Sequence, residues 1–307
     1  TLRPNSVVHS IMYDEKSGKA SGVLVIDSVT KKERKYYAKV IFVNASTVNS
    51  NMLLLNSKSS RFPQGLGNDN GLMGKYIHFH NFTTGITAEY EGFQDKKTEG
   101  INPGGSYIPR FRNVFKQETD FLRGYAAGFS GSRRTENDNE SIGDALRTNL
   151  LETKYTNWRV GSHFMGETIP KASNYLKLDD KLTDEWGIPT VRISVSLDDN
   201  DAKMAQDYRE QMTEMLDLAG FKNIRPYVKR DWNPGQDIHE MGGLPMGENP
   251  KNSQLNKWNQ VHHCKNVFVT DGACMTSSST QNPSLTFMAI TARAANFAAA
   301  EMKKGNL

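Results

Sequence analysis

The feature that most constrains the fold is a strand that leads into a long helix near the end of the chain. The stretch NVFVTDG, residues 266–272, reads as a short apolar strand, and a loop of small polar residues follows it. Asn282 and Pro283 are typical of a helix start, and the Ala-rich sequence after them predicts a helix to about Lys303. The start of a helix gathers free backbone N–H groups, which suit a negatively charged ligand.

A second strand–helix pair lies near the other end of the chain. Residues 7–43 read as strands, and the apolar run 40–43 indicates a strand that is buried on both faces. Residues 46–57 then predict a helix, after a corner of small residues. This order is half of an α/β nucleotide-binding arrangement. The expected apolar side of the helix consists of Val48, Met52 and Leu55.

The middle of the chain has a different character. From about residue 76 to 232, stretches such as 76–90 and 188–198 alternate like strands of an antiparallel sheet, and the loops, notably 131–144, are long and polar. One helix is clear over 201–221, with Gly220 at its expected C-cap. Its expected apolar positions are Ala205, Tyr208, Met212, Met215 and Leu216. The fold class is therefore α/β at both ends of the chain, with an insertion of antiparallel sheet plus helices.

Composition narrows the class of protein. Hydrophobic residues make up 37% and charged residues 23% of the 307 residues, as in a soluble globular protein. The net charge of +4 is too small to argue for nucleic acid as a partner. No apolar run reaches the roughly 18 residues of a membrane helix. We expect a soluble protein of the cytoplasm or periplasm, without choosing between the two. Cys264 and Cys274 fit no metal-ligand spacing, and we expect buried thiols rather than a disulfide.

Two polar residues are candidates for chemistry, each beside a structural alternative. His239 precedes a glycine-rich stretch, EMGGLPMG, and glycine lets a backbone approach a ligand closely. A histidine near its usual pKa of ~6.5 can take up a proton at neutral pH, although it can equally cap a turn. Asn282 can cap the helix that follows it, while its neighbours' backbone faces a ligand.

The remaining polar candidates are less specific. Asp271-Gly272 after a strand is either a plain turn or a site that holds a hydroxyl of a sugar or ribityl chain. His78 and His80 share one face of a possible strand, as a metal pair would. Two ligands do not make a metal site, and no third ligand follows at motif spacing. We therefore predict no metal.

Taken together, these motifs resemble the glucose-methanol-choline (GMC) family of flavoprotein oxidoreductases. The family has a His-x-x-Gly-x-x-x-Met-Gly stretch, then a strand with Asp-Gly, then Asn-Pro-x-Leu-Thr at a helix start. The resemblance extends to the stretches NSVVHSI, YYAKVIFVNAST and GLGNDNGLMGKYIHFH, and is nearest to the sugar-oxidising branch of pyranose oxidase and glucoside 3-dehydrogenase. The matching positions are His239, Gly242, Met246, Gly247, Asp271, Gly272, Asn282, Pro283, Leu285 and Thr286.

The resemblance implies three segments and FAD as cofactor. Residues 1–75 and 235–307 would form parts of a Rossmann-like FAD-binding domain, and residues 76–234 would form the substrate-binding domain. The family's Gly-x-Gly-x-x-Gly fingerprint has no counterpart here, because GLGNDNG has the wrong spacing and follows no strand. We therefore expect a fragment of a longer enzyme that neither holds FAD nor turns over alone. Gly243 also stands where the family commonly has Thr.

The resemblance also implies roles. His239 would accept the proton of a substrate hydroxyl, and Asn282 would hydrogen-bond the same oxygen. Asp271 would bind the ribityl or pyrophosphate region of FAD, with Gly272 keeping the backbone close. Val8 would meet the adenine, and Ala45 would line the nucleotide corner. The helix start would stabilise negative charge on flavin, through the residues Pro283, Ser284 and Leu285 and chiefly the backbone N–H groups of the last two.

The implied activity is FAD-dependent oxidation of a sugar or alcohol hydroxyl. The substrate would pass a hydride to flavin, and a soluble acceptor or small redox protein would take the electrons. Two other functions stay open from the sequence. One is a non-catalytic carbohydrate-binding or interaction module, and the other is a lyase on the same scaffold. The sequence names neither the sugar, the carbon oxidised nor the oligomeric state.

Overall fold

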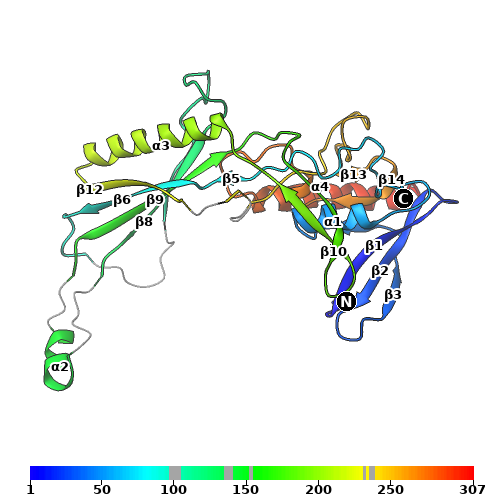
Figure 1. Cartoon of the computed structure of the whole chain (residues 1–307), viewed down its shortest axis with the longest axis horizontal. Helices are drawn as coiled ribbons and strands as arrows, with labels where there is room; N and C mark the ends of the chain where they lie inside the picture. Colours follow the sequence, from blue (N-terminus) through cyan, green and yellow to red (C-terminus); the bar gives the residue numbers. More distant parts are fainter. Residues whose placement is uncertain (97–104, 135–140, 152–154, 231–232, 235–238) are drawn as a thin grey trace.

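The computed structural model describes residues 1–96, 105–134, 141–151, 155–230, 233–234 and 239–307. The molecule is elongated (Figure 1). One end holds the N-terminal sheet together with helices α1 and α4, and the other holds a larger sheet covered by helix α3. The predicted domain boundary after residue 234 is followed by residues 235–238, which lie outside the described part. Residues 135–140 of the predicted loop 131–144 also lie outside it.

The first 43 residues form strands, as predicted. β1 (Ser6–Asp14), β2 (Lys19–Asp27) and β3 (Glu33–Tyr37) make an antiparallel sheet in that order. The strand predicted at residues 40–43 is β4 (Ile41–Val43), and a break at residues 38–40 separates it from β3. The side chain of Asn266 holds this break, because its amide donates to the carbonyl oxygens of Ala20 and Lys39 at 2.7 and 2.9 Å.

The two strand–helix pairs predicted at the ends of the chain lie side by side. β4 pairs in parallel with β14 (Cys264–Val269), and short β13 (Gln260–Val261) pairs with the other edge of β14. Helix α1 (Thr47–Asn56) follows β4, while the 3₁₀ turn η1 (Gly272–Cys274) and helix α4 (Ser284–Lys303) follow β14. The carboxyl ends of both parallel strands therefore meet at one edge of this layer.

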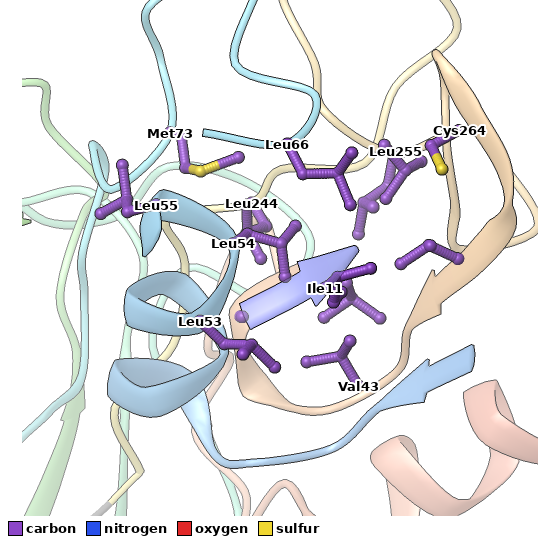
Figure 2. Packing of buried hydrophobic residues seen from close by; sticks show 14 of the residues in the cluster. Ile11, Val43, Leu53, Leu54, Leu55, Leu66, Met73, Leu244, Leu255 and Cys264 are labelled. Atoms are coloured by element: carbon purple, nitrogen blue, oxygen red, sulfur yellow. The ribbon is translucent and has the colours of Figure 1, made fainter. Parts of the chain in front are cut away.

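A hydrophobic core joins these elements (Figure 2). Leu53 and Leu54 of α1 pack toward Ile11 and Val43 from two strands, and Cys264 lies in the same cluster. Cys264 and Cys274 are buried free thiols, as predicted. The expected apolar side of α1 is partly wrong. Its buried residues are Thr47, Ser50, Asn51, Leu53, Leu54 and Leu55, whereas Val48 and Met52 are only half-buried.

The larger sheet is antiparallel, as predicted for the middle of the chain. Its strands lie in the order β12-β6-β9-β8-β7, and β5 also pairs with β9. Their bounds are β5 (His80–Asn81), β6 (Thr84–Tyr90), β7 (Ser106–Ile108), β8 (Tyr125–Ser132), β9 (Trp158–Glu167) and β12 (Lys222–Val228). The short helix α2 (Gly143–Leu151) lies between β8 and β9 in the sequence.

Helix α3 (Asp199–Leu218) confirms the helix predicted over 201–221 and covers the larger sheet through its apolar side. Asp198 begins it with a capping box. The C-cap residue is Ala219, one position before the predicted Gly220, which follows it in the left-handed conformation at φ 82°. Met215 departs from the prediction because it is 36% exposed, at the margin of the buried side formed by Met212 and Leu216.

A hairpin from the middle of the chain joins the core of the first end. β10 (Tyr175–Thr183) pairs with β11 (Pro189–Ser194), and Leu176 of β10 belongs to the same cluster as Leu54. This hairpin and residues 1–75 thus share one core. Within the described ranges, no helix combines the length and the apolar character needed to cross a bilayer.

Candidate active site

The stretch after His239 is hydrogen-bonded to the Asp-Gly corner, residues 271–273, that follows β14. The backbone N–H of Gly242 donates to the carbonyl of Gly272 at 2.9 Å, and that of Leu244 donates to Ala273 at 3.0 Å. Thr47 at the start of α1 donates its hydroxyl to the carbonyl of Glu240 at 2.5 Å. Two motifs that are some thirty residues apart in the sequence are thereby held as one unit against α1.

Glycines make this close packing fit. A Cβ on Gly272 would lie 2.4 Å from Thr47 Oγ1 and 2.7 Å from the carbonyl oxygen of Glu240. Gly243 has φ 92°, and a Cβ on it would lie 2.3 Å from Asn51 Oδ1. The buried Asn51 therefore accounts for glycine at the position where the resemblance suggested threonine. In this structure the glycines bring backbone close to other protein atoms.

The carboxylate of Asp271 organises the corner between β4 and α1. Its Oδ2 accepts the hydroxyl of Ser50 at 2.5 Å, and its Oδ1 accepts the backbone N–H of Ala273 at 2.9 Å. Burial raises the pKa of Asp271, opposed by the hydrogen bonds from Ser50 and from the backbone of Ala273, Ser46 and Ala45. Three residues predicted for the cofactor site, Ala45, Asp271 and Gly272, are thus brought together. Ala45 is exposed.

These contacts explain the polar buried side of α1. Thr47, Ser50 and Asn51 lie at positions i, i+3 and i+4, so they share one face of the helix. That face binds Glu240, Asp271 and Gly242 rather than apolar side chains. A polar stripe at helical spacing directly after a buried strand was the sequence signal for this face.

A second histidine lies against His239. His80 Nδ1 is 2.7 Å from His239 Nδ1, and the two rings meet edge to face at 88°. His80 Nε2 is 2.9 Å from the carbonyl oxygen of Ser279, in the loop that leads to α4. Burial, with a smaller contribution from the nearby His239, lowers the pKa of His80 to about 4, against the raising effect of the Ser279 carbonyl. The sequence raised His80 only as half of a metal pair.

The other member of that pair, His78, is engaged elsewhere. It is fully buried, and its Nδ1 is 2.9 Å from the carbonyl oxygen of Tyr76. Burial lowers its pKa to about 4. It lines a cavity of about 390 Å³ together with Gly242 and Gly243. Among the residues that the structure describes, no group of three or more His, Cys, Asp or Glu is placed to hold a metal ion.

The start of α4 differs from the prediction by one position. The N-cap residue is Pro283, not Asn282, and no side chain in the described part of the molecule caps the helix. The bond from Phe287 N–H to the carbonyl of Pro283, at 3.0 Å, begins the helical ladder. The N–H groups of Ser284 and Leu285 precede it and have no carbonyl to bind within the helix. Leu285 is 76% exposed, so this helix start is open to a ligand.

The predicted site residues fall into groups. His239 is joined through His80 to Ser279, and Tyr107 fastens the next residue of that loop by donating to the carbonyl of Thr280 at 3.0 Å. Asn282 is exposed on the same loop, two residues after Thr280, whose carbonyl is bound in this way. Val8 lies apart from these contacts on β1, where it pairs with Val25 and is 39% exposed.

Comparison with known proteins assigns the family. Residues 170–291 match the family model described as GMC oxidoreductase, and they include His239, Asp271 and Asn282. The chain carries a GMC oxidoreductase domain. The Asp-Gly corner and the start of α4 both lie within the matched residues.

Curated relatives of this GMC chain oxidise or dehydrogenate small hydroxylated molecules, by their names. It is 30% identical to 2-methyl-1,2-propanediol dehydrogenase of Mycolicibacterium austroafricanum, over 96% of this chain and 54% of that protein. It is 27% identical to the fructose dehydrogenase large subunit of Gluconobacter japonicus, over 98% of this chain and 54% of that protein. The chain thus spans about half the length of these relatives.

The fold is also that of a solved oxidase. The crystal structure of formate oxidase superposes with a TM-score of 0.67, over 99% of this chain and 61% of that one, at 12% sequence identity. This likeness shows a mixed α/β fold. At such low identity it says nothing of the substrate.

Proposed function

We propose that this chain takes part in FAD-dependent oxidation of a CH–OH group in a sugar or alcohol, with His239 as the base. The observation that carries the proposal is the chain of contacts from His239 through His80 to Ser279, which fixes a histidine beside the loop before an open helix start. The names of the relatives, a diol dehydrogenase and a fructose dehydrogenase subunit, support this class of substrate.

The residues present fit FAD. Ala45 and Ser46 form an exposed corner of small residues at the carboxyl end of β4, and the uncapped start of α4 offers N–H groups to a negative group. In the proposal, residues 1–75 and 235–307 belong to a Rossmann-like FAD-binding domain, and residues 76–234 hold the substrate. Val8 meets the adenine, and Asp271 acts by ordering the corner that its carboxylate binds.

When bound, FAD supplies the acceptor for the hydride that leaves the substrate carbon. The protein's part is to place the substrate and to move its proton. His239 accepts the proton of the substrate hydroxyl, and Asn282 hydrogen-bonds the same oxygen. The backbone N–H groups of Ser284 and Leu285 would stabilise negative charge on the flavin, and Pro283 sets the direction of the helix. A base of this kind contributes about 10²–10⁴-fold to the rate.

The electrons leave the site to an acceptor. We propose a soluble acceptor or a small redox protein, a choice supported by two relatives that are named dehydrogenases rather than oxidases, one of them a subunit of a larger assembly. The sugar-oxidising branch of the family remains part of the same proposal. A diol dehydrogenase among the relatives makes small alcohols equally worth assaying.

The test uses the full-length protein that contains this chain, expressed with FAD. We expect bound flavin in its absorbance spectrum and bleaching of that flavin under anaerobic conditions by a panel of sugars and alcohols. His239→Ala should retain the flavin and lose most of the bleaching rate, while Ser17→Ala, on a distant exposed turn, should change neither. Loss of flavin from His239→Ala with an unchanged rate per bound flavin contradicts the role of His239. Failure of the wild-type protein to bind flavin contradicts the whole proposal, and favours a non-catalytic carbohydrate-binding module.

A further inference from the structure

We propose that His80 is a positioning residue that fixes His239 in the tautomer with its proton on Nδ1, which leaves Nε2 to take up the substrate proton. The part of this inference that concerns the substrate rests on the proposed function. The part that concerns the tautomer rests on three atoms in contact: His239 Nδ1, His80 Nδ1 and the carbonyl oxygen of Ser279.

The Ser279 contact decides which nitrogen of His80 is protonated. A carbonyl oxygen only accepts hydrogen bonds, so at 2.9 Å His80 Nε2 must carry the hydrogen. His80 is fully buried, and burial lowers its pKa to about 4, so near neutral pH the ring is uncharged. An uncharged imidazole has one N–H, and therefore His80 Nδ1 carries a lone pair.

The lone pair on His80 in turn decides the tautomer of His239. A separation of 2.7 Å between two nitrogen atoms requires one hydrogen between them. Because His80 Nδ1 has none, His239 Nδ1 is the donor. The neutral His239 ring then holds its own lone pair at Nε2, as a proton acceptor must. When Nε2 takes the proton from the substrate hydroxyl, the resulting cation still donates from Nδ1 to His80, in a hydrogen bond strengthened by charge.

The geometry around the pair is restrained. His239 and Ser279 both have left-handed backbone, at φ 72° and 59°, which non-glycine residues adopt at a cost of about 1–3 kcal/mol unless their surroundings impose it. The Phe82 ring lies 6.2 Å from both histidine rings. These contacts hold the two histidine rings nearly perpendicular, at 88°, and they restrict rotation of the His80 ring.

Other titratable groups surround the two histidines and affect how their protonation depends on pH. His78 precedes His80 by two residues and lowers its pKa, and Arg123 acts in the same direction on His78. On the other side, His163 and Lys229 lie against the Phe82 ring. Glu240 follows His239 directly in the chain.

Two substitutions separate the two hydrogen bonds of His80. In His80→Asn, the side-chain oxygen falls where Nδ1 was, so the acceptor for His239 is kept and the bond to Ser279 is lost. In His80→Gln, the side-chain nitrogen falls where Nε2 was, so the bond to Ser279 is kept and the acceptor for His239 is lost. The pair is matched, since each variant is an amide that keeps one of the two contacts.

The direct measurement is the tautomer itself, by nitrogen NMR of the ¹⁵N-histidine-labelled full-length protein, with His239 assigned from its loss in His239→Ala. We expect His239 to be protonated at Nδ1 in the wild-type protein and in His80→Asn, and to become a mixture of tautomers in His80→Gln. Protonation at Nε2 in the wild type, or equal tautomer populations in all three proteins, overturns the proposal. A uniformly structural role for His80 would disturb both variants alike.

The second measurement is the pH profile of flavin bleaching by substrate in the flavin-loaded protein. For His80→Gln we expect a rate on the order of tenfold lower than wild type. Its half-maximal pH should be lower, because the cation of His239 loses its acceptor, while the flavin content is unchanged. His80→Asn should keep the wild-type profile within about twofold. If the tautomers behave as expected but no substrate bleaches the wild-type flavin, the proposed function fails and the positioning by His80 stands.

Discussion

The Ser50 hydroxyl donates to the part-buried Asp271 carboxylate across 221 positions of sequence, at 2.5 Å. This bond joins the first strand–helix pair to the last one. It also supplies a partner to a carboxylate that burial would otherwise penalise. The Asp-Gly corner that the sequence suggested as a ligand site is therefore, first of all, a joint between the two ends of the chain.

Replacing Ser50 with alanine tests the strength of that joint. We expect Ser50→Ala to lower the free energy of unfolding by about 1–3 kcal/mol, because a part-buried carboxylate oxygen loses the donor that the fully buried Ser50 supplies. Ser17→Ala is a matched control, since Ser17 also donates to a carboxylate, that of Asp14, but on an exposed turn. The control should change the free energy by less than about 0.5 kcal/mol in urea unfolding. Equal effects of the two substitutions would show that the buried bond adds nothing.

Asn266 offers a second test, at the break between β3 and β4. Its Oδ1 accepts the N–H of Ala20 at 2.9 Å, and its Nδ2 donates to the carbonyls of Ala20 and Lys39. Asn266→Asp puts an oxygen in place of the donor nitrogen, facing two carbonyl oxygens, so we expect a loss of about 3 kcal/mol or more in the free energy of unfolding.

The exposed Asn306 near the chain end is the control for that change, because Asn306→Asp also replaces a donor nitrogen, here one that bonds the Glu301 carboxylate at 2.6 Å on the exposed surface. We expect it to cost under about 1 kcal/mol. Thermal unfolding at a fixed pH measures both. A small effect at Asn266 would mean that the turn between the two sheets does not depend on its amide.

These tests concern contacts that the sequence only partly foretold. The positions of strands and helices followed from apolar periodicity, but the sequence did not predict that β4 and β14, one from each end of the chain, pair in parallel. The buried side of α1 did not follow, because the prediction gave the interior only to apolar residues. Ser50 and Asn51 are buried because loops from the other end of the chain, Asp271 and Gly242, hydrogen-bond to them.

The candidate site shows the same limit. His239 and the start of α4 could be singled out from local sequence, because a histidine before glycines and an Asn-Pro pair are local signals. One partner of His239 is His80, 159 residues earlier, and nothing local marks that contact. The helix starts at Ser284, one residue later than predicted. Pro283 holds the N-cap position, although it has no side-chain group that could cap the helix.

A pH-dependent contribution to stability is expected from Asp201 in the first turn of α3. Burial raises its pKa to about 7, although the backbone N–H of Asp198 bonds to it. An acid with a folded-state pKa above its unfolded value of 3.8 favours the folded state when protonated. Its stabilising effect is therefore complete below about pH 4, and is lost as the pH rises from there to about 7.

Asp201→Asn removes this titration. Relative to wild type, we expect the variant to gain free energy of unfolding as the pH is raised from 4 to 7, at up to about 1.4 kcal/mol per pH unit, and to level off above 7. Urea unfolding at several pH values measures this difference. A flat difference for Asp201→Asn would place the folded-state pKa of Asp201 at its unfolded value.

Gly272 links the fold to the proposed cofactor site, and its substitution is the most direct test of that link. In Gly272→Ala the new Cβ would lie 2.4 Å from Thr47 Oγ1 and 2.7 Å from the Glu240 carbonyl, so the loop that starts at His239 must move away from α1. We expect a loss of about 1–3 kcal/mol in the free energy of unfolding and weaker flavin binding. Gly131→Ala, on β8, is the control, because its Cβ would meet only Val160 at 3.9 Å. Urea unfolding and flavin titration of the full-length protein measure the two effects. Unchanged flavin affinity in a destabilised Gly272→Ala protein would separate the Asp-Gly corner from the cofactor site and leave it a purely structural joint.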